Sequence, residues 1–182
     1  RIEAVASRNA PTAAAFAADL GIPRHHGYYE ALLADPGVDA VYVPLPNSLH
    51  AQWAIEAARH GKHVLCEKPL ALGLDEAREM FAVARQHKVM LLESYPWWFQ
   101  PQTGELVRLL GSGAIGRVLS VQASFGFMLG DAPGNIRLNP ALGGGALLDL
   151  GSYVVSLTRL AMGSAPQRVA ADVTWAASGV DL

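Results

Sequence analysis

The sequence has almost no cysteine and comparatively little charge. A single cysteine, Cys66, stands among 182 residues, which excludes an intramolecular disulfide. Because chains without disulfides are typical of reducing compartments, we expect a cytoplasmic protein. Charged residues make up 16% of the chain, below the ~25% of an average soluble domain, whereas hydrophobic residues reach 51%. Much of the chain must therefore be buried in a core.

Charge of one sign and long apolar runs are also lacking. The formal net charge is −2 and the lysines and arginines are scattered, which argues against a nucleic-acid-binding surface. No uninterrupted apolar run approaches the ~20 residues that a membrane-spanning helix requires. His25 and His26 are adjacent but have no third ligand at a useful spacing, so we expect no metal site.

What is present is a regular alternation of strand and helix patterns. Asn9 is a suitable N-cap for a helix that Gly21 ends, and similar units recur along the first half of the chain. The predicted strands cover residues 2–6, 39–45, 62–67 and 89–93, and the predicted helices cover 11–20, 29–33, 48–60, 75–87 and 101–110. This order predicts an α/β fold with a doubly wound, parallel, Rossmann-like sheet.

The pattern changes near residue 117. Residues 118–127 alternate like a strand covered on one face, and a glycine- and proline-rich loop is expected at 130–145. A helix at 146–161 and a strand at 168–176 follow. We therefore expect a dinucleotide-binding domain over 1–99 and an α+β substrate domain with a mainly antiparallel sheet over 100–182. Since two strands and one helix cannot make a covered sheet, we expect this second domain to be incomplete.

Two polar segments suggest a redox active site. The first ends the apolar run at 63–67 and puts Lys68 at the carboxyl end of a strand, where open α/β sheets bind their ligands. The second reads GGGALLDLGSY over 143–153 and places Asp149 one helical turn before Tyr153. A phenol has an ordinary pKa of about 10, and a nearby ammonium group lowers that pKa. Lys68 would therefore prepare Tyr153 for proton exchange.

Each of these residues also has a structural interpretation. Lys68 could be a solvated lysine at a strand end. Tyr153 could be a core tyrosine whose hydroxyl finds a backbone partner, and Asp149 could cap the N-terminus of a helix. Arg137, in the loop before the triple glycine, could meet substrate or phosphate, or could be an ordinary surface arginine.

Four motifs together resemble one family of enzymes. They are PLPNSLH at 44–50, CEKPL at 66–70, SGAIGRV at 112–118 and the triple glycine leading through 143–153. In this order they resemble the glucose-fructose oxidoreductase, inositol dehydrogenase and rhizopine-catabolism (GFO/IDH/MocA) family of NAD(P)-dependent oxidoreductases, and the resemblance runs nearly end to end.

The resemblance implies roles for the two polar segments. It places Lys68 beside the nicotinamide and the substrate, with Asp149 and Tyr153 completing the catalytic centre. A tyrosine in place of the histidine found in many members is similar to the branch with dihydrodiol dehydrogenase and NADP-dependent xylose dehydrogenase, in which the tyrosine is the acid-base group. The implied substrate is a sugar, polyol or diol that exchanges hydride with nicotinamide C4.

The resemblance and the residue types also indicate a cofactor site. Ser7 and Arg8 follow a strand where an acidic residue would bind the ribose of NAD, and a guanidinium there suits the 2′-phosphate of NADP, although Arg8 could be an ordinary turn arginine. We therefore expect NADP, with NAD possible. The remaining expected cofactor-binding residues are Pro44, Leu45, Asn47, His50, Glu67, Lys68 and Trp98.

Three of these cofactor residues have alternatives. His50 could be a hydrogen-bonded helix histidine, and Glu67 is expected to act as a structural partner near the cofactor rather than as a base. Trp98 stands where many relatives have an arginine, and the tandem indoles at 97–98 could form the floor of a sugar site or belong to the core.

One departure from the family concerns the cofactor cradle. Relatives begin with a strand and a Gly-x-Gly-x-x-Gly turn, which this sequence lacks, so we expect a fragment whose longer parent is the active enzyme. A homodimer or homotetramer is expected by resemblance. The alternative functions are an NAD-dependent glycoside hydrolase of the same family and a non-catalytic regulator that senses nucleotides.

Overall fold

The computed structural model describes residues 1–130 and 134–182, which divide into two compact units. Unit 1 comprises Arg1–Leu45, His50–Glu67 and Gly73–Glu93. Unit 2 comprises Pro46–Leu49, Lys68–Leu72 and Ser94–Leu182. Two short segments of the N-terminal half, Pro46–Leu49 and Lys68–Leu72, thus belong to unit 2.

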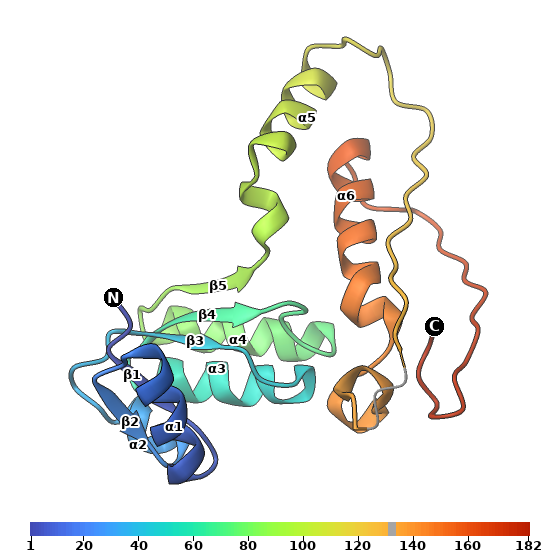
Figure 1. The fold of residues 1–182 in the computed structure, drawn as a ribbon. Helices are drawn as coiled ribbons and strands as arrows, with labels where there is room; N and C mark the ends of the chain where they lie inside the picture. Colours follow the sequence, from blue (N-terminus) through green and yellow to red (C-terminus); the bar gives the residue numbers. More distant parts are fainter. Residues whose placement is uncertain (131–133) are drawn as a thin grey trace. The chain divides into compact units, whose positions relative to one another are not determined.

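Unit 1 is built from parallel strands and the helices that connect them (Figure 1). The strands β1 and β2 form one parallel pair, and β3, β4 and β5 form a second sheet in which β3 and β4 are parallel. This confirms the predicted Rossmann-like α/β fold with parallel sheets. In chain order the elements are β1 (Ala4–Ala6), α1 (Ala10–Leu20), β2 (Arg24–His26), α2 (Tyr29–Leu33), β3 (Ala40–Val43), α3 (His50–Arg59), β4 (His63–Glu67), α4 (Leu74–Gln86) and β5 (Leu91–Ser94).

Helix α1 begins and ends where its sequence predicts. Asn9 has an extended backbone, and its side-chain oxygen accepts a hydrogen bond of 2.9 Å from the backbone N–H of Thr12. This bond satisfies one of the donors that the first turn of a helix leaves unpaired. Gly21 ends the helix with φ of 63°, a left-handed conformation that glycine adopts without steric cost.

The sheet of β3 and β4 is apolar on the face that its helices cover. Helix α3 contacts both strands, and α4 packs beside α3 (Figure 1). Successive side chains of a strand point to opposite faces, so alternate residues enter this core whereas Tyr42 and Leu65 remain exposed on the other face. The buried strand residues are Val41, Val43, Val64 and Cys66.

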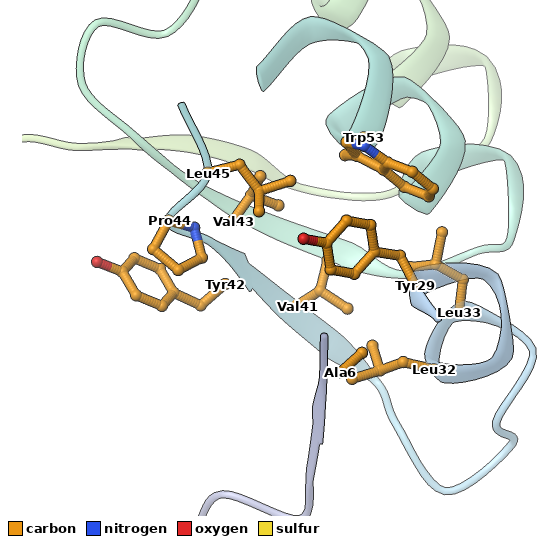
Figure 2. Close-up of a pocket in the computed structure, with 10 residues that line it drawn as sticks. All are labelled: Ala6, Tyr29, Leu32, Leu33, Val41, Tyr42, Val43, Pro44, Leu45 and Trp53. Atoms are coloured by element: carbon orange, nitrogen blue, oxygen red, sulfur yellow. The ribbon is translucent and has the colours of Figure 1, made fainter. Parts of the chain in front are cut away.

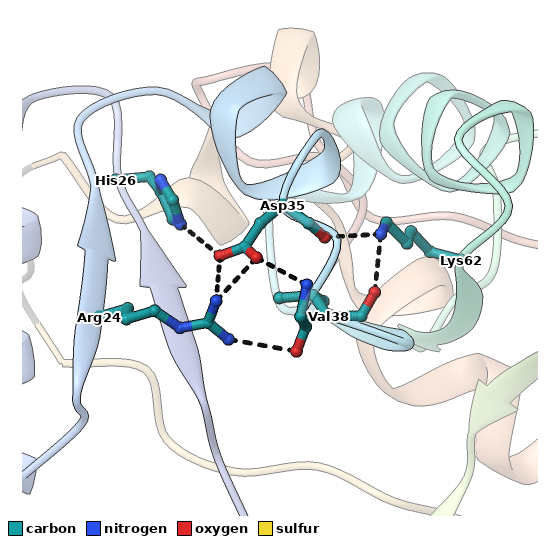
Figure 3. Close-up of polar contacts among 6 residues, drawn as sticks. Arg24, His26, Asp35, Val38 and Lys62 are labelled. Carbon is teal, nitrogen blue, oxygen red and sulfur yellow. Dashed lines mark hydrogen bonds and ion pairs between the residues drawn. The ribbon is translucent and has the colours of Figure 1, made fainter.

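Polar side chains cluster around Asp35 in unit 1 (Figure 3), and we term this cluster the Asp35 clasp. The Asp35 carboxylate accepts hydrogen bonds from Arg24 Nη1 at 2.7 Å and from the Gly37 backbone N–H at 2.8 Å, and lies 3.2 Å from His26 Nε2. The Gly37 bond is the main cause that lowers the pKa of Asp35, and contacts with His26 and Arg24 add to it against the opposing effect of burial.

The clasp connects the two sheets of unit 1. The buried ammonium group of Lys62 donates hydrogen bonds to the backbone carbonyls of Asp35 at 2.8 Å and Val38 at 2.7 Å. Arg24 and His26 belong to β2, whereas Lys62 directly precedes β4. Side chains from both sheets therefore meet at one short loop, and the two carbonyls satisfy a charge that would be costly to bury alone.

Unit 2 consists of helices and short turns joined by extended chain. Its main helices are α5 (Pro101–Gly111) and α6 (Ser152–Met162), which lie near the predicted positions. The short elements are the 3₁₀ turns η1 (Asn47–Leu49), η2 (Pro96–Phe99), η3 (Ile136–Leu138) and η4 (Pro140–Leu142), and the π-helical turn η5 (Leu147–Gly151). The loop expected at 130–145 thus contains two of these turns, and its residues 131–133 lie outside the described part.

Two strand predictions in unit 2 were wrong, and one strand of unit 1 was missed. Residues 118–127 and 168–176 form no ladder, and the described part of unit 2 contains only an isolated antiparallel bridge between Trp175 and Asp181. The alternating pattern at 118–127 predicts which face is apolar, but a strand also needs a neighbour for its backbone groups. The missed strand β2 carries Arg24 and both histidines, a polar composition that hid it.

One helical stretch among the described residues, Pro140–Met162, is long and apolar enough to cross a membrane, with a mean hydropathy of 1.2 in its best window. A core helix of a soluble protein passes the same test of length and composition. The stretch contains Asp149, whose carboxylate is ion-paired. It is therefore weak evidence for a membrane span.

Candidate active site

Lys68, Asp149 and Tyr153 lie together in unit 2. Lys68 Nζ donates hydrogen bonds to the Asp149 backbone carbonyl at 2.6 Å and to Asp149 Oδ1 at 2.8 Å. The same nitrogen lies 5.1 Å from the centroid of the Tyr153 ring. Both side chains of the ion pair are mostly shielded, with 15% and 16% of their surfaces exposed. Two motifs far apart in the sequence thus form one polar cluster, and the peptide bond that follows Lys68 is cis.

The carboxylate of this cluster stands on a π-helical turn. In η5 the Ser152 N–H reaches back five residues to the Leu147 carbonyl instead of the four of an α-helix. Asp149 presents both its side chain and its carbonyl oxygen to Lys68 from this turn. Single π turns occur frequently at functional sites. The sequence predicts a continuous α-helix here, since the apolar spacing does not distinguish the two windings.

The triple glycine brings the loop close to its neighbours at the start of this turn. A Cβ atom on Gly144 would lie 2.5 Å from the Arg137 carbonyl oxygen, and one on Gly145, whose φ is 114°, would collide with the Asp181 carboxylate. That carboxylate also accepts a hydrogen bond from the Leu147 N–H. Asp181 therefore accepts a hydrogen bond from a backbone N–H at the N-terminus of the helix. The Asp149 carboxylate is instead bound by two cations, so Asp149 does not cap this helix.

Arg137 is the second cation on Asp149. Its Nε donates a 2.7 Å hydrogen bond to Asp149 Oδ2, so each carboxylate oxygen has its own cationic partner. Burial works to raise the pKa of Asp149, but hydrogen bonds and charge from Lys68 and Arg137 outweigh it and leave the pKa below its ordinary value. Asp149 is therefore ionised at neutral pH. The sequence shows no local signal that distinguishes Arg137 from a surface arginine.

Aromatic side chains hold the Tyr153 ring. Tyr95 stacks on it with ring centroids 4.9 Å apart and an interplanar angle of 19°, and Phe125 approaches edge-on at 5.5 Å. Such pairs fix the orientation of a ring as well as burying it. Trp97 and Trp98 follow in η2 with their rings edge-to-face at 5.4 Å, and Trp98 is 48% exposed.

Asn47 is part of the same unit. Its side-chain amide donates a 2.8 Å hydrogen bond to the Gly143 carbonyl at the start of the triple glycine. Asn47 thus connects the PLPNSLH motif to the loop that leads to Asp149. The sequence predicts a cofactor contact for Asn47 and does not predict this bond.

In unit 1, Glu67 is hydrogen-bonded to a tyrosine. Tyr42 Oη donates to Glu67 Oε1 at 2.6 Å. This bond, with contributions from burial and from the negative charge of Glu67, raises the pKa of Tyr42 to about 12. Tyr42 therefore remains a protonated donor at neutral pH. The arrangement agrees with the interpretation of Glu67 as a structural partner.

His50 is fully buried at the N-terminus of α3, with 0% of its surface exposed. Its Nε2 lies 2.7 Å from the Leu45 carbonyl oxygen. In this geometry His50 has no surface to offer a ligand, and it holds the backbone of the PLPNSLH motif. The alternative of a hydrogen-bonded helix histidine describes its position.

Pro44 and Leu45 line an apolar cavity of about 140 Å³ in unit 1 (Figure 2). The cavity adjoins the last residues of two parallel strands, Ala6 of β1 and Val43 of β3. Its wall includes the rings of Tyr29 and Trp53, which pack edge-to-face at 4.7 Å, whereas the Tyr42 ring points away from them. An apolar hollow beyond the carboxyl ends of parallel strands is the usual position of a ligand in an α/β sheet.

Ser7 and Arg8 directly follow β1. The Ser7 N–H donates a 3.2 Å hydrogen bond to the His26 carbonyl and so continues the ladder with β2. Arg8 is exposed and forms no ion pair within the described residues. Its guanidinium is therefore available to an anion from outside the chain. Residues 1–130 and 134–182 contain no group of three or more His, Cys, Asp or Glu side chains arranged to hold a metal ion.

Comparison with known families covers nearly the whole chain. Residues 1–95 match the GFO/IDH/MocA domain described as "Oxidoreductase family, NAD-binding Rossmann fold". Residues 93–181 match the GFO/IDH/MocA C-terminal domain. The boundary between the two matches lies close to the end of β5.

Individual relatives are sugar- and diol-converting enzymes by name. The chain is 47% identical over 171 residues to D-xylose 1-dehydrogenase (NADP(+)) 2 of Haloferax volcanii. These residues make up 94% of the chain and 52% of the relative. It is 38% identical to trans-1,2-dihydrobenzene-1,2-diol dehydrogenase of Danio rerio, over 100% of the chain and 54% of the relative. The chain spans about half the length of these relatives.

A solved structure shows the same likeness. The chain superposes with a TM-score of 0.82 and 41% identity on a 3-ketoreductase from Actinomadura kijaniata in complex with NADP and TDP-benzene. The match covers 88% of this chain and 49% of the ketoreductase.

Proposed function

Because the chain belongs to the GFO/IDH/MocA oxidoreductase family, we propose that its protein is an NADP-dependent oxidoreductase acting on a hydroxyl or carbonyl group of a sugar, polyol or diol. The names of the xylose and dihydrodiol dehydrogenases support this substrate class. The observation that carries the proposal is the meeting of Lys68, Asp149 and Tyr153.

Tyr153 is the proposed acid-base group. Its Oη exchanges the proton of the substrate oxygen, and the Lys68 ammonium polarises that oxygen and favours the phenolate. The Asp149 carboxylate, ionised and bound on both oxygens, holds the Lys68 ammonium in place. When bound, the nicotinamide supplies the hydride chemistry, and the protein supplies orientation and charge.

Residues of unit 1 fit the proposed NADP. Arg8 offers a guanidinium that forms no ion pair with any described residue, after β1, where a 2′-phosphate is recognised in dinucleotide folds. Ser7 precedes it directly. The cavity lined by Pro44 and Leu45 is apolar and aromatic, as a flat ring system requires. The described residues contain no glycine-rich turn for the pyrophosphate, so the proposal names no residue that binds it.

Further cofactor residues act, in this proposal, directly or through neighbours. His50 acts through Leu45, and Asn47 through the triple-glycine loop that it holds. Glu67 and the exposed Trp98 remain proposed contacts. We also propose the domain limits 1–99 and 100–182, a cytoplasmic location and a homo-oligomer.

The test is turnover by the full protein with a panel of aldoses, polyols and diols, followed by NADPH absorbance. We expect Lys68→Met and Tyr153→Phe to lower kcat by about 10²–10⁴-fold while the Kd for NADP changes by less than about threefold. Tyr28→Phe, at a tyrosine that is 61% exposed, is the matched control and should retain turnover.

Three outcomes distinguish this function from the alternatives. Unchanged turnover in both variants would reject the proposed site. Release of sugar from a glycoside added to the panel, without net change in NADPH absorbance, would indicate a glycoside hydrolase of the same family. Dinucleotide binding without turnover on any member of the panel would favour a regulator.

A further inference from the structure

Two cations share one carboxylate in unit 2. Lys68 binds Oδ1 of Asp149, and Arg137 binds Oδ2. With both bases protonated and the acid ionised, the three side chains carry a net charge of +1. Without Arg137, the charges of Lys68 and Asp149 would cancel. The presence of Arg137 therefore decides whether the Tyr153 ring, 5.1 Å from Lys68 Nζ, faces a neutral pair or a positive cluster.

Arg137 is held from several directions. Its backbone N–H donates a 3.0 Å hydrogen bond to the Asn135 side chain, and its carbonyl accepts a 2.9 Å hydrogen bond from the Gly145 N–H. Its guanidinium carbon lies 5.8 Å from the centroid of the Phe127 ring. The two backbone bonds fix the point from which the side chain starts, and the Phe127 ring lies beside its guanidinium, although 45% of the side chain is exposed.

We propose that Arg137 is a positioning residue that balances the charge of Asp149 and so keeps the Lys68–Tyr153 pair electropositive. The inference rests on the proposed function, in which Tyr153 exchanges a proton. A phenolate at Tyr153 is stabilised by positive charge in its surroundings, and half of the charge that offsets Asp149 comes from Arg137. The Tyr153 ring is contacted by the Lys68 ammonium, by the stacked phenol of Tyr95 and by Phe125. The ammonium is paired in turn with Asp149 of η5, to which Arg137 of η3 also binds.

The role differs from that of Lys68. Lys68 lies next to the Tyr153 ring, whereas Arg137 binds Asp149, the ion-pair partner of Lys68. Loss of Arg137 should therefore change the protonation equilibrium at Tyr153 more than the affinity for substrate. Arg137→Gln should lower kcat with little change in KM, and should move the limb of the kcat/KM pH profile that reports Tyr153 toward higher pH.

The direct test is an NMR titration of the full protein labelled with ¹³C at tyrosine Cζ, with the Tyr153 signal assigned from Tyr153→Phe. We expect Arg137→Gln to shift the Tyr153 titration midpoint upward by about one pH unit, and Arg137→Lys, which keeps the charge, to recover at least half of that shift. The matched control is Arg78→Gln, which removes an exposed arginine–aspartate pair on α4 and should shift nothing.

An unshifted midpoint in a folded Arg137→Gln protein would overturn the proposal. If that variant does not fold, Arg137→Ala is titrated with and without added guanidinium ion, and a midpoint that guanidinium does not move would overturn it equally. The titration requires no substrate, so failure of the proposed function on every substrate leaves this test intact. Conversely, an unshifted midpoint in an active enzyme rejects Arg137 alone.

Discussion

Substitution of His50 by alanine tests whether this histidine supports the fold or contacts a ligand. The ring is fully buried and its Nε2 lies 2.7 Å from the Leu45 carbonyl. Truncation removes this hydrogen bond, leaves a partly buried carbonyl without a partner, and opens a cavity the size of an imidazole. From these effects we expect the free energy of unfolding to fall by about 3 kcal/mol.

Equilibrium unfolding in urea, followed by far-ultraviolet circular dichroism, measures this change. With an m-value of about 2 kcal/mol/M, the midpoint should fall by about 1.5 M. The matched control is His60→Ala, at a partly exposed histidine directly after α3 whose Nδ1 lies 2.9 Å from the Glu56 carbonyl oxygen. It should change stability by less than about 0.5 kcal/mol.

The cofactor affinity decides between the two interpretations. If His50 acts through Leu45, weaker NADP binding must accompany the loss of stability. A His50→Ala protein with unchanged stability but weaker NADP binding would refute the reasoning, because it would mean that the ring touches the cofactor and contributes little to the fold.

Three further predictions concern titratable groups of unit 1. The pKa of Asp35 is lowered from 3.8, so the ionised carboxylate stabilises the fold above that pH, and this contribution is lost as the pH falls through the folded pKa. In denaturation experiments at decreasing pH, Asp35→Asn should therefore reduce the dependence of the free energy of unfolding on pH in the acid range. The pKa of Tyr42 is raised from 10.0 to about 12, so its bond to Glu67 contributes fully to stability below pH 10.0 and is lost as the pH approaches about 12. In an ultraviolet absorbance titration, Tyr42→Phe should remove one tyrosine that ionises near pH 12. Burial raises the pKa of Cys66 to about 12, so a thiol reagent at pH 8 should react with it only after urea unfolds the protein.

Local signals in the sequence predict the elements of unit 1 well. The Asn9 cap and the Gly21 stop act within a few residues, and their pattern is complete in the sequence. The fold class follows from the order of such elements. The motifs around Lys68 and Tyr153 could be paired in advance because each has a recognisable spacing, and the structure brings them together.

Long-range partners were not predictable in the same way. The alternation at 118–127 resembles a strand, yet no described residue pairs with it, since periodicity indicates a face and not a neighbour. The role of Arg137 depends on which carboxylate the folded loop brings within 2.7 Å. The π turn at Asp149 is also invisible in the apolar spacing, because one extra residue per turn changes few contacts over five residues.

The Asp35 clasp has a consequence for how unit 1 opens. Within the described residues, the sheet of β1 and β2 and the sheet of β3, β4 and β5 share no backbone hydrogen-bond ladder. Hydrogen bonds of the Asp35 clasp therefore supply polar links between the two sheets. Loss of these links would let β1 and β2 exchange their amide hydrogens as a separate cooperative segment, ahead of the rest of the unit. Arg8 follows β1 directly, so if Arg8 binds the 2′-phosphate as proposed, the preference for NADP over NAD would vary with the order of that segment.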